Sequence, residues 1–270
     1  MINAQIILDS KNKYTGDRLT TFKLTYPRFI HSEMLTHRVF SRNSASSRAV
    51  PIKKMIERIS ENPVFPSEWR MNEKGMQGYK LANSSLTAKC DLEWEKALEN
   101  ALESAEILND LGVHKQHVNR LLEPFMHVEV LLSGTEWNNF LKLRCDEAAQ
   151  PEIGILACKI KTLLNYSIPK ERAYHLPFID NYLFDNYPIS MLFKISTARC
   201  ARVSYFLNNG KESDVESDIK LATRLKENGH WSPFEHPSKV AVNSYRYGNY
   251  IGWVQYRKMF NDESNGDYAQ

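Results

Sequence analysis

Residues 37–48 read HRVFSRNSASSR, a stretch that gathers three arginines, one histidine and four serines around a single asparagine. Arginine guanidiniums and serine hydroxyls bind phosphate through charge-assisted hydrogen bonds, and free backbone N–H groups can join them. A basic surface loop is the ordinary alternative for such a composition. Alternation over residues 22–30 predicts a strand, and residues 32–40 predict a helix. We therefore expect a functional loop held between rigid elements.

The bulk composition is that of an ordinary globular protein. The 270 residues are 42% hydrophobic and 25% charged, enough for one large domain or two small ones. A net charge of +3 gives no general reason to expect a nucleic-acid partner. No apolar run approaches the roughly 20 residues of a membrane span, and no signal peptide is evident. Four cysteines without a Cys-x-x-Cys pair predict reduced thiols, no metal site and a cytoplasmic location.

The periodicity along the chain predicts more helices than strands. Helices are expected over 52–59, 85–111, 114–122, 135–147, 150–165 and around 218–225, where Asn228-Gly229 ends the last one, and strands over 6–8, 20–26, 126–132 and 239–242. Residues 189–198 fit either a helix or a strand. This order predicts one α+β domain over residues 1–270, with helices packed on a modest, largely antiparallel sheet. Residues 60–85, rich in proline and glycine, predict a lid or an insertion.

The spacing of Thr36-His37-Arg38, seven residues and Ser46 resembles the signature of the flavin-dependent thymidylate synthases. That signature reads Arg-His-Arg, seven residues, Ser. The chain departs from it at Thr36, where the family has its first arginine. It also has Glu33 where many members have Gln, and Ser44 where many have Glu.

Two further segments carry the same resemblance. Residues 139–153, NFLKLRCDEAAQPEI, are similar to the family's helix Asn-Phe-Leu-x-Leu-Arg … Ala-Gln-x-Glu-Ile. Residues 201–205, ARVSY, and 229–236, GHWSPFEH, resemble motifs that usually precede the arginine-rich signature. Here they follow it, so the motif order looks circularly permuted. Such an order is tolerated where the original termini lie close together at the surface.

The resemblance implies a flavin-dependent thymidylate synthase-like fold and reductive methylation of dUMP at C5 to give dTMP. FAD would accept hydride from NADPH, and methylenetetrahydrofolate would supply the one-carbon unit, because side chains perform such chemistry poorly. The family binds flavin without a Gly-x-Gly-x-x-Gly fingerprint, so the absence of one here does not count against it. The family also implies a homotetramer with shared sites. No membrane or nucleic-acid partner is expected.

The resemblance also assigns residues to the two ligands. Arg144 would be catalytic, since a cation beside the O2/N3 edge of the base stabilises charge that develops there; its alternative is a surface arginine with a packed stem. Arg120 would help hold the phosphate, or would merely end a helix favourably. Ser232 would contact flavin, or would cap a short helix with Pro233 at its first position. The nucleotide side comprises Glu33, Ser44, Ser46, Ser47, Arg48, Arg120 and Arg144, and the flavin side His37, Arg38, Val39, Asn139, Ser204, His230, Ser232 and Glu235.

Two alternatives remain beside dUMP methylation. A related flavin enzyme could methylate or hydroxymethylate another pyrimidine deoxynucleotide such as dCMP, because a Glu33 carboxylate would accept a hydrogen bond from an amino group. A nucleic-acid-binding module using residues 37–48 is the alternative from another class. That module would be colourless and would bind oligonucleotides with a steep salt dependence, whereas a flavin enzyme would be yellow.

Overall fold

The computed structural model describes residues 1–75, 78–203 and 214–260. Its main sheet has five strands in the order β3-β4-β2-β1-β5, all antiparallel except the β1–β5 pair. A three-stranded antiparallel sheet, β10-β7-β6, and the β8–β9 hairpin lie beside it. The strands are β1 (Asn3–Asn12), β2 (Arg18–Pro27), β3 (Ser41–Ser44), β4 (His127–Gly134), β5 (Lys170–Arg172), β6 (Tyr174–His175), β7 (Ser238–Val240), β8 (Arg246–Tyr247), β9 (Tyr250–Ile251) and β10 (Trp253–Gln255). The prediction of an α+β fold with a largely antiparallel sheet is confirmed.

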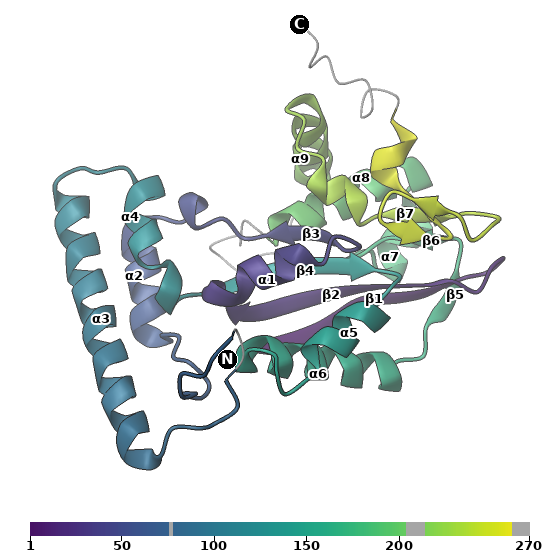
Figure 1. Ribbon diagram of the computed structural model, residues 1–270. Helices are drawn as coiled ribbons and strands as arrows, with labels where there is room; N and C mark the ends of the chain where they lie inside the picture. The colour runs from purple at the N-terminus through teal and green to yellow at the C-terminus, as the bar shows by residue number, and fades with distance from the viewer. Residues whose placement is uncertain (76–77, 204–213, 261–270) are drawn as a thin grey trace, which may run out of the picture.

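One face of the main sheet is covered by α5 (Asn138–Arg144) and α6 (Pro151–Tyr166), as Figure 1 shows. Alternate residues of the two central strands point to this face and form the largest apolar cluster with α6. Period-two alternation is what a sheet covered on that face requires. The cluster includes Phe22, Leu24, Tyr26, Val128, Val130, Leu132, Phe140, Ile153, Leu156 and Ile160.

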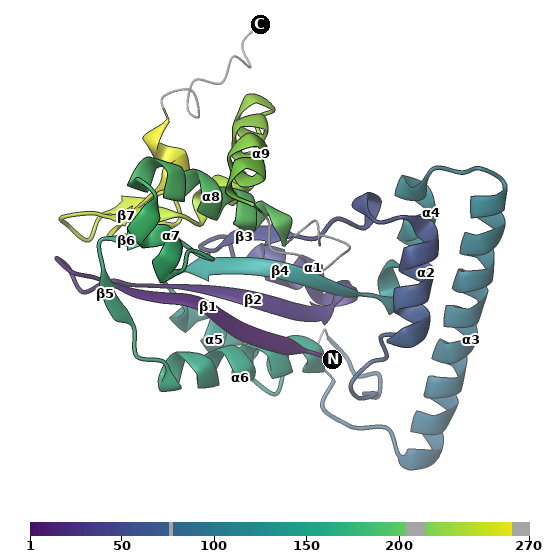
Figure 2. The same cartoon turned by 180° about the vertical axis from the view of Figure 1, so that it is seen from behind.

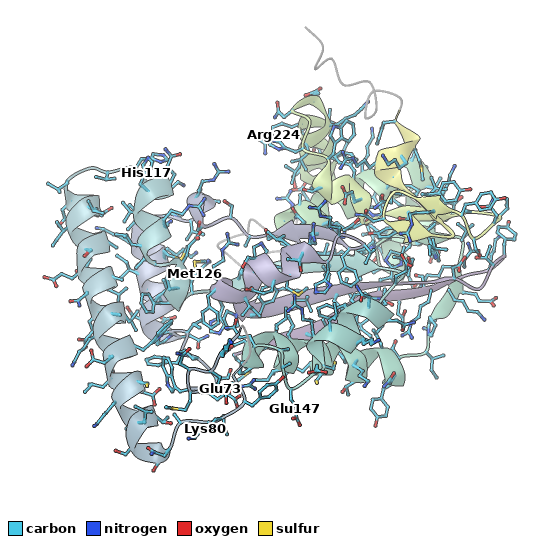
Figure 3. All side chains as sticks on the ribbon, in the orientation of Figure 1. Glu73, Lys80, His117, Met126, Glu147 and Arg224 are labelled. Carbon is cyan, nitrogen blue, oxygen red and sulfur yellow. The ribbon has the colours of Figure 1, made fainter. Side chains whose placement is uncertain are left out.

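The opposite face is covered by α8 (Ile189–Arg202), by the short α7 (Asn181–Asn186) and by the small sheets, with α9 (Val215–Glu227) packed on α8 (Figure 2). At one end of the sheet, α2 (Ile52–Glu61), α3 (Ser84–Asp110) and α4 (Lys115–Leu121) form a layer with its own apolar cluster. Met126, labelled in Figure 3, belongs to that cluster where the helices meet the sheet. The remaining elements are α1 (His31–Thr36) and the 3-10 helices η1 (Arg28–Ile30), η2 (Ser47–Ala49), η3 (Glu123–Phe125), η4 (Ser232–Glu235) and η5 (Tyr256–Met259).

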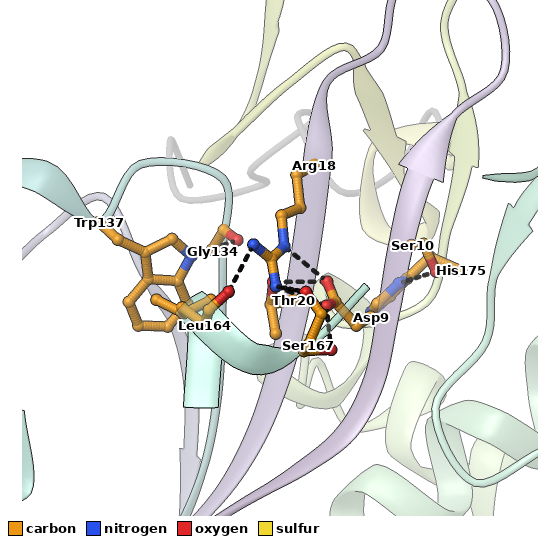
Figure 4. A network of polar contacts seen from close by, with 9 residues as sticks. All are labelled: Asp9, Ser10, Arg18, Thr20, Gly134, Trp137, Leu164, Ser167 and His175. Atoms are coloured by element: carbon orange, nitrogen blue, oxygen red, sulfur yellow. Dashed lines mark hydrogen bonds and ion pairs between the residues drawn. The ribbon is translucent and has the colours of Figure 1, made fainter. Parts of the chain in front are cut away.

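Asp9 ties the β1–β2 hairpin to the end of α6 (Figure 4). Its carboxylate accepts hydrogen bonds from Arg18 Nε at 2.9 Å and Nη2 at 2.6 Å, from Thr20 Oγ1 at 2.9 Å and from Ser167 Oγ at 2.6 Å. Arg18 also donates to the carbonyl of Leu164, which lies in the last turn of α6. A bidentate arginine with two hydroxyls satisfies a nearly buried carboxylate, and so it fixes the helix against the strands.

Two fully buried histidines connect the main sheet to the C-terminal segment. His175 hydrogen-bonds to Ser10 Oγ and Thr21 Oγ1, both at 2.8 Å, and Thr21 Oγ1 lies 2.6 Å from Ser133 Oγ. Ser133 Oγ in turn lies 2.8 Å from His236 Nδ1. Burial lowers the pKa of His175 well below its usual value and lowers the pKa of His236 to about 3. Both imidazoles are therefore neutral in the folded protein.

We expect stability to fall as the pH is lowered from 7.5 to 5. The unfolded chain takes up protons on these histidines near pH 6.5, while folded His236 takes one up only near pH 3. Protonation therefore favours the unfolded state across this window, by about 2 kcal/mol per buried histidine at pH 5. Urea unfolding followed at both pH values measures the effect. His236→Gln should lose part of the pH dependence, and the exposed-site variant His117→Gln should keep it.

The structure differs from the sequence-based prediction at the central motif. Residues 41–44, predicted as part of a loop, form β3 at the edge of the sheet, and α1 ends at Thr36 rather than near Phe40. His37 leaves the helix with ψ of 85°, which turns the chain toward the strand. Residues 189–198, which fitted helix or strand, lie in α8. In the described part of the chain, no helix is long and apolar enough to span a bilayer.

Candidate active site

The first motif segment, residues 36–46, meets the second, residues 139–153, at His37. The third segment comprises residues 201–205 and 229–236. Arg144, the last residue of α5, donates from Nε to His37 Nε2 at 3.0 Å, and its Nη2 lies 3.5 Å from Thr36 Oγ1. The His37 ring also packs edge-on against Phe140, with centroids 5.0 Å apart. Two segments separated by more than one hundred residues are therefore held together by a guanidinium–imidazole hydrogen bond.

The third motif segment meets the first along β3. Asn43 donates from Nδ2 to the carbonyl of Cys200 at 2.8 Å, and Ser232 Oγ lies 3.5 Å from Asn43 Oδ1. Gln255 donates to Ser41 Oγ at 2.8 Å and to the carbonyl of Glu235 at 3.1 Å. We call residues 36–43, together with Arg144 and the 232–235 turn, the motif junction.

The motif junction concentrates positive charge. Arg42 donates from Nη1 to the carbonyls of Leu35 and His37 at 3.1 and 3.0 Å, which satisfies acceptors left free at the end of α1. Burial lowers the pKa of His37, and the charges of Arg144 and Arg42 lower it further. Burial lowers the pKa of the Arg42 guanidinium, and the charge of the exposed Arg38 adds to this lowering. Such mutual repulsion is relieved by an anion.

Glu235 supplies negative charge to the same region. It accepts a hydrogen bond from Arg257 Nη1 at 2.6 Å, and its charge favours the protonated form of Arg42. The turn that carries it is the 3-10 helix η4. Its N-cap is Trp231, and no side-chain capping hydrogen bond is present, so the interpretation of Ser232 as a helix cap is wrong.

A separate pocket of about 540 Å³ lies between the loop after β3, helix α2 and the ends of β2 and β4. Its size falls in the range of small-molecule sites. Ser46 and Ser47 are the two predicted site residues in its wall, and Arg58, Glu129 and His127 are charged or titratable groups there. The complete lining is Thr25, Ala45, Ser46, Ser47, Ala49, Val50, Pro51, Met55, Arg58, Ile59, Glu61, Asn62, Met126, His127 and Glu129.

Ser47 and Arg120, two predicted phosphate ligands, converge on Glu123. Ser47 Oγ donates to Glu123 Oε1 at 2.8 Å, and Arg120 Nη1 lies 2.6 Å from the same oxygen. Arg28 Nη2 lies 3.7 Å from it. Asn119 anchors the loop by donating to the carbonyls of Ser47 and Val50 at 2.7 and 3.0 Å. The Ser47 hydroxyl hydrogen and one Arg120 N–H are thus directed at a protein carboxylate.

The other predicted site residues lie around these two centres. Arg48 is exposed, and Ser44 is half-buried on β3. Glu33 is half-buried on α1, where its carboxylate accepts a hydrogen bond from Ser32. Val39 packs against the main apolar cluster, and Asn139 and His230 are exposed on α5 and after α9. Ser204 lies outside the described residues.

The pocket and Arg144 lie on opposite faces of the sheet. Thr25 and Glu129 in the pocket alternate with Tyr26 and Val128, which pack toward α6 on the other face. Arg144 projects from α5, which covers that other face. Within one chain, the arginine predicted to polarise the base is therefore separated by the sheet from the serines predicted to hold the phosphate.

Several residues of the site were missed in the sequence. Arg42 and Asn43 stand inside the predicted motif, but only the β3 register shows that they point to opposite faces. Glu123, Arg58 and Glu129 belong to no motif. The sequence offered one signal for a site residue among these three. Glu129 stands between Val128 and Val130, as an acidic residue does on the polar face of an alternating strand.

The donors at the motif junction suit a negatively charged dinucleotide. Arg38 is exposed, and Arg42 and Arg144 are half-buried with their guanidiniums beside His37. Planar guanidiniums bind diphosphate oxygens bidentately. His37, kept neutral by burial and by the two arginines, adds no further charge. Arg38 and Arg42 could thus hold the diphosphate of a flavin dinucleotide such as FAD.

Comparison with known sequences identifies a family over the first part of the chain. The profile of the Thy1 family, thymidylate synthase complementing protein, matches residues 19–170. This range is more than half of the 270 residues and contains the first two motif segments, whereas residues 201–236 lie beyond it. No curated protein sequence matches the chain significantly.

Solved structures show more distant likenesses. The UMP/dUMP methylase PolB from Streptomyces cacaoi is 14% identical in its complex with 5-Br UMP, with 61% of this chain and 88% of that chain covered at a TM-score of 0.48. Its complex with 5-Br dUMP is 15% identical, with 61% of this chain and 90% of that chain covered at a TM-score of 0.49. The flavin-dependent thymidylate synthase ThyX from Helicobacter pylori, complexed with FAD and dUMP, is 21% identical, with 53% of this chain and 66% of that chain covered at a TM-score of 0.37. These overlaps are too limited to carry an argument about the site.

Proposed function

Because the chain belongs to the Thy1 family of thymidylate synthase complementing proteins, we propose that it is a flavin-dependent enzyme that methylates C5 of a pyrimidine deoxynucleotide. The observation that supports this most is the meeting of three distant motif segments at residues 36–43, through the Arg144–His37 hydrogen bond and the contact of Ser232 with Asn43. The reaction proposed first is conversion of dUMP to dTMP, with NADPH as reductant and methylenetetrahydrofolate as one-carbon donor.

In this proposal FAD would be held by Arg38 and Arg42, with His37, Val39, Asn139, His230, Ser232 and Glu235 around it. FAD supplies hydride-transfer chemistry that side chains lack. Ser44, Ser46, Ser47 and Arg48 would bind the nucleotide phosphate with Arg120. Glu123 accepts the Ser47 hydroxyl hydrogen and one Arg120 N–H, at 2.8 and 2.6 Å, so it would orient Arg120 while the remaining Arg120 N–H groups stay available to the phosphate.

Arg144 would act on the base. Negative charge that develops at the O2/N3 edge when C5 becomes nucleophilic is stabilised by a fixed guanidinium. The hydrogen bond to His37 at 3.0 Å fixes the direction of that guanidinium before substrate binds. Arg144 lies on the sheet face opposite the pocket, so in this proposal the Arg144 of a second copy of the chain would reach the nucleotide. A homotetramer with shared sites, as the family resemblance implies, would provide this arrangement.

Two measurements test the proposal. The purified protein should show flavin absorbance, and it should release tritium from dUMP or dCMP labelled at C5. A colourless protein that binds oligonucleotides with a steep salt dependence would instead support the nucleic-acid-binding alternative. A yellow protein that exchanges the C5 proton of neither nucleotide would refute pyrimidine methylation.

A further inference from the structure

The segment between α2 and α3, for which the sequence predicts a lid or an insertion, is fastened to the turn that follows α5. We call its described residues, 62–75 and 78–83, the connecting segment. Arg70 of this segment donates from Nη1 to the carbonyl of Glu147 at 2.8 Å and to that of Ala149 at 3.4 Å. Glu147, labelled in Figure 3, lies in the turn between α5 and α6. One guanidinium therefore holds two carbonyls of that turn.

The Arg70 guanidinium is itself held by its own segment. Its Nε donates to Glu68 Oε1 at 2.6 Å, and Nη1 donates to the carbonyl of Gly78 at 3.0 Å. A planar guanidinium fixed in this way presents its donors in one direction. A second contact lies at the start of α6, where the buried Glu152 accepts a hydrogen bond from the backbone N–H of Ser67 at 2.6 Å. The connecting segment thus grips the turn both at its centre and where α6 begins.

The turn matters because Arg144 is the last residue of α5, a helix of only seven residues. A helix this short is unstable by itself, so the groups packed around it determine where its end lies. On one side, α6 approaches so closely that a Cβ atom at Gly154 would lie 3.5 Å from the Arg144 carbonyl oxygen. On the other side, the chain passes through Cys145 directly into the turn held by Arg70.

We propose that Arg70 is a positioning residue for Arg144, because its grip on the turn fixes the end of α5 and keeps the Arg144 guanidinium directed at His37. This rests on the proposed function in assigning Arg144 to the base of the nucleotide. Arg70 would act through geometry, since its own charge is paired with Glu68. A displacement of about 1 Å in a catalytic group can lower a rate on the order of 10²-fold.

Arg70→Ala should lower the rate of C5 proton exchange about 10-fold while nucleotide affinity is kept. The pKa of His37, followed by NMR titration, should rise in the same variant. Burial lowers that pKa, and among the described residues the charges that lower it further are those of Arg144 and Arg42. A rise therefore reports movement of Arg144 and not the loss of charge at position 70. Lys74→Ala removes an exposed cation from the same segment and should change neither measurement.

A double variant separates positioning from a general structural role. In an Arg144→Ala background, Arg70→Ala should cause no further loss of exchange, because its effect passes through Arg144. A further 10-fold loss in that background would overturn the inference, as would a loss of exchange without any rise in the His37 pKa. If Arg70→Ala folds poorly, Arg70→Lys replaces it, because lysine keeps the cation and three donors. It should show the same dependence on Arg144 with a smaller loss.

The outcomes for this inference and for the proposed function differ. A wild-type protein that exchanges the C5 proton of neither dUMP nor dCMP would refute the methylation. The His37 pKa in Arg70→Ala would still show whether Arg70 fixes Arg144, since that measurement needs no turnover. Conversely, unchanged exchange and an unchanged His37 pKa in Arg70→Ala would refute the positioning role and leave the methylation intact.

Discussion

Arg144→Ala is expected to lower the rate of C5 proton exchange by roughly 10²–10³-fold, the usual cost of removing one donor that stabilises developing charge. Nucleotide binding should be largely kept, since the phosphate contacts lie elsewhere. Arg144 donates to His37 at 3.0 Å, and its charge lowers the pKa of that imidazole. The variant should therefore raise the pKa of His37, which NMR titration measures separately from activity.

The control for this variant is Lys142→Ala, which removes an exposed cation from the same helix. Its exchange rate should stay close to that of wild type. A fully active Arg144→Ala enzyme would remove Arg144 from the mechanism. A rise in the His37 pKa without any loss of exchange would leave Arg144 with a positioning contact only.

Because Arg144 and the pocket lie on opposite faces of the sheet, mixing two inactive variants tests whether each site combines two chains. An inactive Arg144→Ala protein mixed with an inactive phosphate-site variant, Ser46→Ala with Arg48→Ala, should regain roughly a quarter of wild-type activity if each site combines two chains. That fraction is the share of sites that receive one intact half from each partner. No recovery after subunit exchange would mean that both halves of the site come from one chain.

Asp218→Asn is expected to destabilise the protein by about 2–4 kcal/mol, below the full cost of breaking a buried ion pair because the arginines keep some solvent contact. The Asp218 side chain is fully buried on α9, and it accepts from Arg199 Nε at 3.1 Å and from Arg202 Nε at 2.9 Å on α8. Both guanidiniums are about 20% exposed. The amide would leave two arginines facing a neutral group. Urea unfolding measures the loss.

Glu216→Gln on the same helix provides the matched comparison. Its ion pair with Lys220 is an exposed i,i+4 contact, with side chains 78% and 74% exposed, so the variant should leave stability close to that of wild type. If the two variants destabilise equally, the Asp218 cluster does not hold α9 against α8. The cluster matters for the site because α8 presents the Cys200 carbonyl to Asn43.

Local sequence predicted most helices and the central strands. The helices expected over 85–111 and 150–165 are α3 (Ser84–Asp110) and α6 (Pro151–Tyr166), and the strand expected over 126–132 is β4. The helix containing Asp218 ends at Glu227, with Asn228 as its cap and Gly229 at a φ of +68°. Periodicity and capping are local properties of a chain, so one sequence is sufficient to read them.

The sequence by itself determined most of the secondary structure, the family and the identity of the motif segments, because each depends on residues that are close together in the chain. Only the tertiary structure decided that residues 41–44 pair as an edge strand and that Arg144 meets His37. It also decided that the pocket lies across the sheet from Arg144 and that Glu129 faces it. These facts depend on strand register and on contacts between distant segments, since a shift of one residue reverses every side chain in a strand.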